Sequence, residues 1–145
     1  MAEVKVILLA AGESRRMGVA NKLLLEIGGV PLVRRMAERL AAIPDADVTV
    51  VLGHEADEIR AVMSGLPVEF TMNDNHAKGQ MSSVHAGLAA AGKGRCFLIV
   101  PADMPQLSTL DCLLLLDAHD EAAEGLVTVP CRGHAGDRQR GNPVI

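Results

Sequence analysis

The chain has 145 residues, of which 49% are hydrophobic, and it carries a net charge of −4 at pH 7. This length suits one domain that buries a sizeable core without a disulfide or a structural metal. The negative balance, with only two phenylalanines and no tryptophan or tyrosine, argues against a nucleic-acid partner, which needs a basic surface and stacking platforms.

The location of the protein is indicated by its apolar runs and its cysteines. No run is long enough to span a bilayer and no secretory leader is recognisable, so we expect a cytoplasmic protein without a membrane partner. Cys96, Cys112 and Cys131 are widely spaced and show no zinc pattern, which favours buried or incidental thiols in a reducing compartment.

The predicted elements begin with a strand over 4–10, which is almost wholly apolar, as in a parallel strand covered on both faces. Helical patterns then alternate with further apolar runs, which predicts an α/β fold: a Rossmann-like, three-layer αβα arrangement around a mostly parallel sheet. The predicted strands are 4–10, 47–52, 68–72, 96–100 and 126–130. The predicted helices are 32–42, 56–63, 81–91 and 109–122.

Several helix ends carry recognisable signals. Pro31 suits a first helical turn, and Ser108 with Asp111 resembles a capping box. Gly65 and Gly92 are plausible stops for the helices before them. These signals support the predicted boundaries.

The segment 9–18 directly follows the first strand, at the carboxyl edge where open α/β sheets bind ligands. The small residues at 10–12 let the backbone approach a ligand and offer its N–H groups to phosphate oxygens. Arg15, Arg16 and Lys22 add positive charge. We therefore expect this loop to cradle a nucleoside triphosphate.

Two better-known phosphate loops do not fit this segment. The P-loop needs four residues between its glycines and a lysine after the second, whereas Gly12 and Gly18 are separated by five. The dinucleotide fingerprint needs an acidic residue after the second strand, where this chain has Gly53 and His54. The alternative interpretation is a solvated loop whose arginines have no function.

Asp103 follows the fourth apolar run, between two prolines, and should emerge at the same sheet edge. A carboxylate beside a triphosphate is repulsive unless a cation lies between them, and Mg²⁺ favours one or two carboxylates together with phosphate oxygens. We expect Asp103 to hold Mg²⁺. The alternative is that Asp103 only organises the turn or caps a helix.

A third loop, 73–83, lies between the third strand and a helix start. Ser82 and Ser83 can bind a base edge or a phosphate, although a simple N-cap role fits either equally well. Lys78 favours a solvated position. Ser14, the serine of the glycine loop, has no neighbouring histidine base, and the Gly-x-Ser-x-Gly elbow of serine hydrolases is absent. The five histidines lack metal-ligand spacing, so the predicted chemistry is transfer of a phosphorus group to a substrate that supplies its own oxygen nucleophile.

These residues resemble the MobA-like nucleotidyltransferases, and within them most closely the molybdenum cofactor cytidylyltransferases. The match covers nearly the whole chain. The family's opening motif is met by Leu9, Ala10, Ala11, Gly12, Ser14, Arg16, Met17, Gly18 and Lys22. Its later motifs are met by Asn73, Gly79, Ser82 and Ser83, by Asp103-Met104-Pro105, and by Gly141-Asn142-Pro143.

The resemblance implies a domain that binds CTP with Mg²⁺ and joins CMP to the phosphate of molybdopterin, releasing pyrophosphate, with a molybdenum enzyme as a further partner. It assigns catalysis to Arg16, Lys22 and Asp103, with Asp103 also the metal ligand. The implied nucleotide-binding residues are Leu9, Ala10, Ala11, Gly12, Ser14, Arg15, Arg16, Gly18, Lys22, Asn73, Gly79, Ser82 and Ser83. The methyl group of Ala11, where guanylyltransferases carry glycine, should crowd a purine and favours CTP over GTP.

The chain departs from the family pattern at Asp74, where proline is frequent, and at His76, where an aromatic residue is common. Family members continue beyond residue 145, so we expect 1–145 to be a single nucleotide-binding domain that is incomplete at its C-terminus. Two alternatives stay open. One is a guanylyl- or sugar/alcohol-phosphate nucleotidyltransferase, and the other is a non-catalytic nucleotide-binding maturation factor for a molybdenum enzyme.

Overall fold

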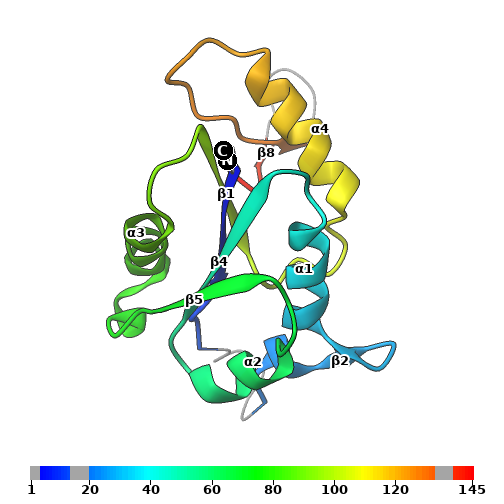
Figure 1. Ribbon diagram of the computed structural model, residues 1–145, viewed down its shortest axis with the longest axis vertical. Helices are drawn as coiled ribbons and strands as arrows, with labels where there is room; N and C mark the ends of the chain where they lie inside the picture. Colours follow the sequence, from blue (N-terminus) through cyan, green and yellow to red (C-terminus); the bar gives the residue numbers. More distant parts are fainter. Residues whose placement is uncertain (1–3, 14–19, 133–138) are drawn as a thin grey trace.

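The computed structural model describes residues 4–13, 20–132 and 139–145. Its centre is a parallel sheet in the order β5-β4-β1-β6, so the first strand of the chain lies inside the sheet (Figure 1). The strands of this sheet are β1 (Val4–Ala10), β4 (Ala46–Leu52), β5 (Val68–Met72) and β6 (Cys96–Pro101). The mostly parallel sheet and the α/β fold predicted from the sequence are confirmed.

Helices cover both faces of the sheet. Figure 1 shows α3 on one side and α1, α2 and α4 on the other. In β1, Ile7 and Leu9 pack with residues of α3, whereas the alternate residues Val6 and Leu8 belong to the larger core on the opposite face. The period of two in a strand produces this division. The helices are α1 (Leu32–Ala41), α2 (Ala56–Val62), α3 (Gln80–Ala91) and α4 (Thr109–Asp120).

The helix α3 lies unusually close to the sheet at Gly87. A methyl group there would clash with Cγ2 of Ile7 and would lie 3.0 Å from Cγ2 of Val51. Only glycine fits this contact without movement of the helix. The position of the start of α3 over the sheet edge therefore depends on a residue about two turns further along the helix.

The predicted helices and the first four predicted strands are confirmed with ends that differ by at most two residues. The capping box is also present, since Ser108 Oγ accepts from the Asp111 backbone N–H and the Asp111 side chain accepts from the Ser108 N–H. The helix stop at Gly92 is confirmed, because Gly92 is the C-cap of α3 with φ +71°.

The strand predicted over 126–130 is wrong. Thr128 exchanges two backbone hydrogen bonds with Ile145, of 2.8 and 3.1 Å, but no strand forms around it. Leu126 and Val127 are 56% and 70% exposed, so this apolar run has no covered sheet face against which to pack.

Short elements between the main ones escaped the sequence patterns. A hairpin with a two-residue loop joins β2 (Glu26–Ile27) to β3 (Val30–Pro31), and its loop glycines, Gly28 and Gly29, have φ of +61° and +78°. Two adjacent glycines between apolar residues are a known signal for this turn. The other short elements are η2 (Lys22–Leu24), η3 (His76–Lys78), β7 (Cys131–Arg132) and β8 (Gln139–Arg140).

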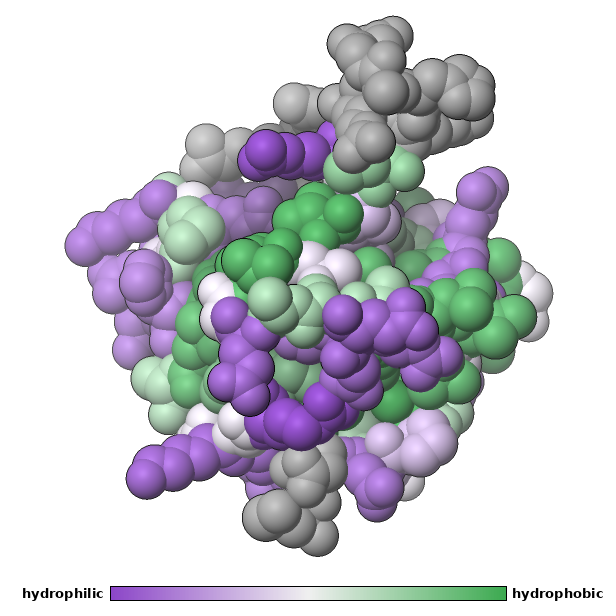
Figure 2. Space-filling model, turned by 90° about the horizontal axis from the view of Figure 1, so that it is seen from above, coloured by the Kyte–Doolittle hydropathy of each residue, from purple (hydrophilic) through white to green (hydrophobic). Residues whose placement is uncertain are grey.

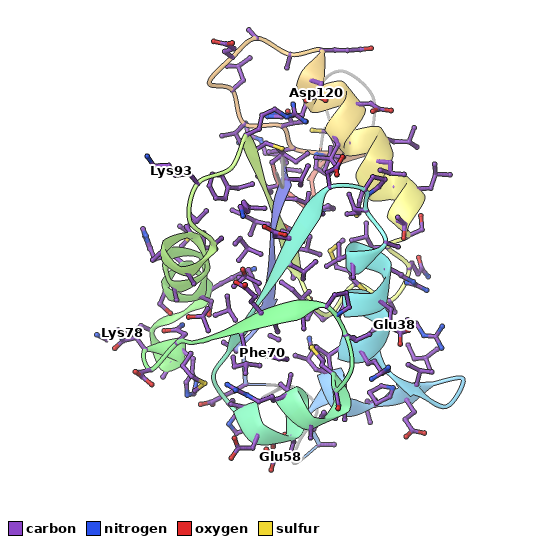
Figure 3. All side chains as sticks on the ribbon, in the orientation of Figure 1. Glu38, Glu58, Phe70, Lys78, Lys93 and Asp120 are labelled. Carbon is purple, nitrogen blue, oxygen red and sulfur yellow. The ribbon has the colours of Figure 1, made fainter. Side chains whose placement is uncertain are left out.

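The face of the molecule drawn in Figure 2 carries hydrophilic side chains with apolar patches between them. Lys78 is exposed and points outward from η3, as the sequence predicted (Figure 3). On α4, Leu110 and Leu114 are 62% and 59% exposed. No helix in the described part of the chain is both long and apolar enough to cross a membrane.

Candidate functional site

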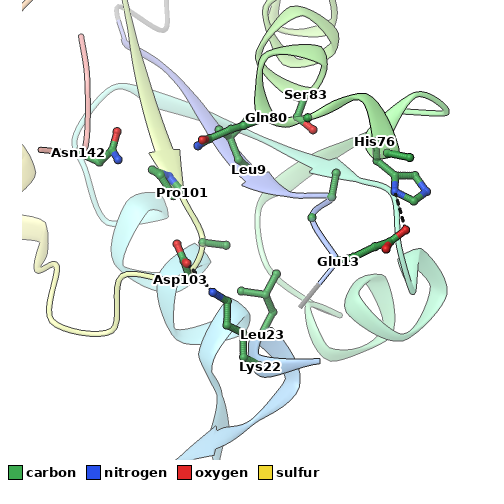
Figure 4. A pocket seen from close by; sticks show the side chains of 15 residues that line it. Leu9, Glu13, Lys22, Leu23, His76, Gln80, Ser83, Pro101, Asp103 and Asn142 are labelled. Carbon is green, nitrogen blue, oxygen red and sulfur yellow. Dashed lines mark hydrogen bonds and ion pairs between the residues drawn. The ribbon is translucent and has the colours of Figure 1, made fainter. Parts of the chain in front are cut away.

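A pocket of about 480 Å³ opens at the carboxyl edge of the sheet (Figure 4). It is lined by residues that follow β1 and β6, by η2, and by the loop that leads from η3 into α3. These are the three loops that the sequence analysis placed at this edge. The structure therefore brings together residues as far apart in the chain as Leu9 and Asn142.

The floor of the pocket is the end of β1, whose backbone is tied to both neighbours. The Leu9 carbonyl accepts from the Ala102 N–H at 3.1 Å, and the Ala11 carbonyl accepts from the His54 N–H at 3.2 Å. Gly12 lines the pocket, and, its two chain neighbours aside, no atom of the described residues lies within 4 Å of the position that its Cβ would take. The backbone at Gly12 is thus open to a ligand.

Gly53 lets the loop after β4 meet this floor. A Cβ at Gly53 would lie 2.8 Å from the Ala11 carbonyl oxygen, 2.8 Å from Cβ of His76 and 2.9 Å from Cβ of Ala11. The methyl group of Ala11 therefore faces Gly53, and Ala11 is only 1% exposed. Any larger residue at 53 would push the floor and the η3 loop apart.

One wall of the pocket carries an ion pair between residues that are 81 positions apart. Nζ of Lys22 lies 2.7 Å from Oδ2 of Asp103, and the two side chains are 40% and 44% exposed (Figure 4). Lys22 is held by η2, whose N-cap Asn21 accepts from the Leu23 N–H through its side chain at 3.0 Å. A cation and an acid thus meet beside the open backbone of Gly12.

The loop before α3 is organised by the Asn73 side chain. Asn73 is 4% exposed and donates from Nδ2 to Oγ of Ser82 at 2.8 Å and to Oγ of Ser83 at 2.9 Å. Its Oδ1 accepts from the Asn75 N–H at 2.9 Å. Because these contacts use the whole amide group, Asn73 positions the two serines.

The opposite wall holds Glu13 and His76. Nδ1 of His76 is buried and lies 3.9 Å from Oε1 of Glu13, which is an ion pair only when the imidazole is protonated (Figure 4). Gln80, the first residue of α3, also lines the pocket. Glu13 and Gln80 were not predicted as site residues, because they stand at positions that the motifs leave variable. His76 was noted only as a departure from the aromatic residue that is common there.

The predicted site residues divide into three groups. Seven line the pocket: Leu9, Ala11, Gly12, Lys22, Gly79, Ser83 and Asp103. Three do not line it: Ala10 is fully buried in the core, and Asn73 and Ser82 form hydrogen bonds within their own loop. Four lie outside the residues that the structure describes: Ser14, Arg15, Arg16 and Gly18. Asn142, from the late motif of the resemblance, also lines the pocket.

Two curated relatives carry similar sequences. The chain is 33% identical over 125 residues to a probable molybdenum cofactor guanylyltransferase of Natronomonas pharaonis, covering 84% of this chain and 61% of the relative. It is 40% identical over 101 residues to a molybdenum cofactor guanylyltransferase of Cereibacter sphaeroides, covering 68% of this chain and 49% of the relative. The chain thus spans about half to three fifths of these relatives.

Solved structures share the fold. A nucleotidyl transferase from Methanothermobacter superposes with a TM-score of 0.80 at 25% identity, over 98% of this chain and 70% of that one. A Mycobacterium tuberculosis protein in complex with manganese superposes with a TM-score of 0.62 at 20% identity, over 81% of this chain and 59% of that one. The second likeness supports the fold alone.

The family model described as the MobA-like NTP transferase domain matches residues 6–145, nearly the whole chain. The match includes every loop that lines the pocket. The chain therefore belongs to the MobA-like NTP transferase family.

Proposed function

We propose that this pocket binds a nucleoside triphosphate and transfers its nucleoside monophosphate to the phosphate of a molybdopterin-type acceptor. The observation that carries the proposal is the meeting of the open Gly12 backbone with Lys22 and Asp103 in one pocket. The names of the two curated relatives supply the acceptor. The same geometry supports donor binding, whatever the acceptor.

The reaction needs no nucleophile from the protein. An oxygen of the acceptor phosphate attacks the α-phosphorus in line, the bond to the bridging oxygen of the β-phosphate breaks, and pyrophosphate leaves with that electron pair. Gly12 offers its backbone close to the phosphates, and the ammonium of Lys22 offsets the negative charge that develops on them. Arg16 stays a predicted catalytic residue outside the described part of the chain.

Asp103 fits a divalent cation. Its carboxylate is 44% exposed to the pocket and already accepts a cation, the Lys22 ammonium, at 2.7 Å. Carboxylate and phosphate oxygens are the ligands that Mg²⁺ prefers. When bound, Mg²⁺ neutralises part of the phosphate charge, and the role of Asp103 is to hold it while Lys22 is released to the phosphates.

The base has two candidates, each with one observation in its favour. GTP is favoured by the names of the curated relatives. CTP is favoured by the sequence resemblance and by the methyl group of Ala11. Because that methyl group faces Gly53 and Ala11 is only 1% exposed, the methyl group is poorly placed to crowd a purine base. We propose GTP as the first donor and CTP as the second.

The proposal is tested by incubating the protein with molybdopterin, Mg²⁺ and each of GTP, CTP, ATP and UTP, and measuring pyrophosphate. We expect release with GTP that requires molybdopterin. If pyrophosphate is released with CTP and with none of the other nucleotides, again only when molybdopterin is present, CTP is the donor. Release that instead requires a sugar phosphate would replace the acceptor, and nucleotide binding without release would indicate the non-catalytic maturation factor.

We also propose a partner, a location and a domain extent for the chain. A molybdenum enzyme as partner rests on the family resemblance. A cytoplasmic location is supported by the wide spacing of the three cysteines, which favours reduced thiols. We propose that 1–145 is one nucleotide-binding domain, and the pocket lined by residues from Leu9 to Asn142 supports this.

A further inference from the structure

Arg39 of α1 reaches the loop that carries Asp103. Its Nη1 donates to the Pro105 carbonyl at 2.7 Å and to the Leu107 carbonyl at 2.8 Å. The Thr109 hydroxyl at the start of α4 donates back to the Arg39 carbonyl at 2.8 Å. One guanidinium nitrogen therefore joins two carbonyls of the loop, although Arg39 itself does not line the pocket.

The other end of the same loop is also fixed. The Ala102 N–H donates to the Leu9 carbonyl of β1 at 3.1 Å, and Ala102 is 1% exposed. Within the loop, the Leu107 N–H donates to the Met104 carbonyl at 3.0 Å. Asp103 thus lies between an anchor on the sheet and an anchor on α1, and its carboxylate faces the pocket.

We propose that Arg39 is a positioning residue for the divalent cation, acting through the backbone of 104–107 on the carboxylate of Asp103. The inference rests on the proposed function, because it takes Asp103 as the metal ligand. Hydrogen bonds from a charged donor are stronger than neutral ones, and a planar guanidinium holds a fixed direction. Groups that orient a ligand from outside the metal's own shell change metal affinity about 10–100-fold.

The same helix offers a matched control. Nη1 of Arg34 donates to the carbonyls of Val62 and Ser64, at 2.9 and 3.1 Å, and so holds the end of α2 as Arg39 holds the Asp103 loop. Arg34 also pairs with Glu38 through Nε at 2.9 Å. Its removal tests the loss of an arginine that anchors two carbonyls, without any link to Asp103.

The experiment measures Mn²⁺ binding to the full chain by electron paramagnetic resonance, at a fixed concentration of GTP that supplies phosphate oxygens and without molybdopterin, so that no turnover occurs. The variants are Arg39→Gln, Arg39→Lys, Arg34→Gln and Asp103→Asn, each checked by its melting curve. We expect Arg39→Gln to weaken Mn²⁺ binding roughly tenfold, and Arg39→Lys, which keeps a charged donor, to restore part of it. Arg34→Gln should bind Mn²⁺ as the wild type does despite a similar loss of thermal stability.

The outcomes separate this inference from the proposed function. Unchanged Mn²⁺ binding in Arg39→Gln, with weakened binding in Asp103→Asn, would overturn the role of Arg39 alone. Equal weakening in Arg34→Gln and Arg39→Gln would show a general effect of stability and would also overturn it. Unchanged binding in Asp103→Asn, or none in the wild type, would overturn the metal role of Asp103 and the inference with it.

Discussion

Asp103 has the Lys22 ammonium as its partner at 2.7 Å, and both side chains are about two fifths exposed. An ion pair this exposed contributes at most about 1 kcal/mol to the free energy of unfolding. The carboxylate therefore matters for what it binds rather than for the fold. The two roles are separable by a change that keeps the shape of the side chain and removes its charge.

We predict that Asp103→Asn lowers turnover roughly 100-fold or more and leaves the free energy of unfolding within about 1 kcal/mol of the wild type. Pyrophosphate release and urea unfolding measure the two quantities. Asp47→Asn is the matched control, because Asp47 forms a similar ion pair with Lys5 at 2.6 Å and does not line the pocket. An Asp103→Asn variant with normal turnover would contradict the metal role.

At the scale of single residues, Lys22 and Asp103 could be placed at the pocket from the sequence, but Glu13 and His76 could not. Lys22 and Asp103 were found because each follows an apolar run that had to end at the same edge of a parallel sheet. Glu13 and His76 were missed because their place on the wall depends on how closely two loops approach at Gly53. Asn73 stays a predicted nucleotide-binding residue, and its contacts with Ser82 and Ser83, which a motif cannot show, order the loop.

At the scale of elements, α3 must lie close to the sheet for its first residues to reach the pocket. We predict that Gly87→Ala lowers the free energy of unfolding by up to about 2 kcal/mol, because overpacking against Ile7 costs about 1–3 kcal/mol and the helix propensity of alanine offsets roughly 1 kcal/mol of it. Urea unfolding measures this. His85→Ala, at an exposed position of the same helix, is the control.

The control should be neutral or slightly stabilising, since it adds helix propensity without a clash. A Gly87→Ala variant as stable as the wild type would mean that α3 can move outward at no cost. A change in nucleotide affinity should then follow, because Gln80 and Ser83 line the pocket from the same helix.

Helices were predictable where the spacing of apolar residues and a capping signal agreed, as in α4 with its Ser108 capping box. The segment 126–130 shows the limit, because an apolar run predicts a strand only if a partner and a covered face exist. Those depend on the whole arrangement, and here Thr128 pairs with Ile145 and the Pro130 carbonyl accepts from the Gly141 N–H without a continuous ladder. The hairpin at Gly28 and Gly29 was missed for a different reason: its strands, two residues each, are too short to show a period.

On the scale of the whole molecule, the rates at which a reagent labels the three thiols measure how readily the folded chain unfolds around each of them. Cys96 in β6 is 5% exposed and Cys112 in α4 is 1% exposed, whereas Cys131 is exposed. Burial, followed by the negative charge of Asp111, raises the pKa of Cys112 to about 11 from an ordinary value of 9.0. Since the thiolate is the reactive form, Cys112 should be inert in the folded protein.

We predict that a thiol reagent at pH 8 labels Cys131 rapidly, and labels Cys96 and Cys112 only as fast as the chain unfolds. Cys131→Ser should remove the rapid phase and leave the slow one. The raised pKa also sets a pH dependence: the folded chain keeps the Cys112 proton while the unfolded chain releases it, so the stability present below about pH 9 falls as pH rises towards 11. Cys112→Ala should reduce that fall, measured by urea unfolding at pH 8 and pH 10. Rapid labelling of all three thiols would instead mean that the sheet and α4 separate without global unfolding.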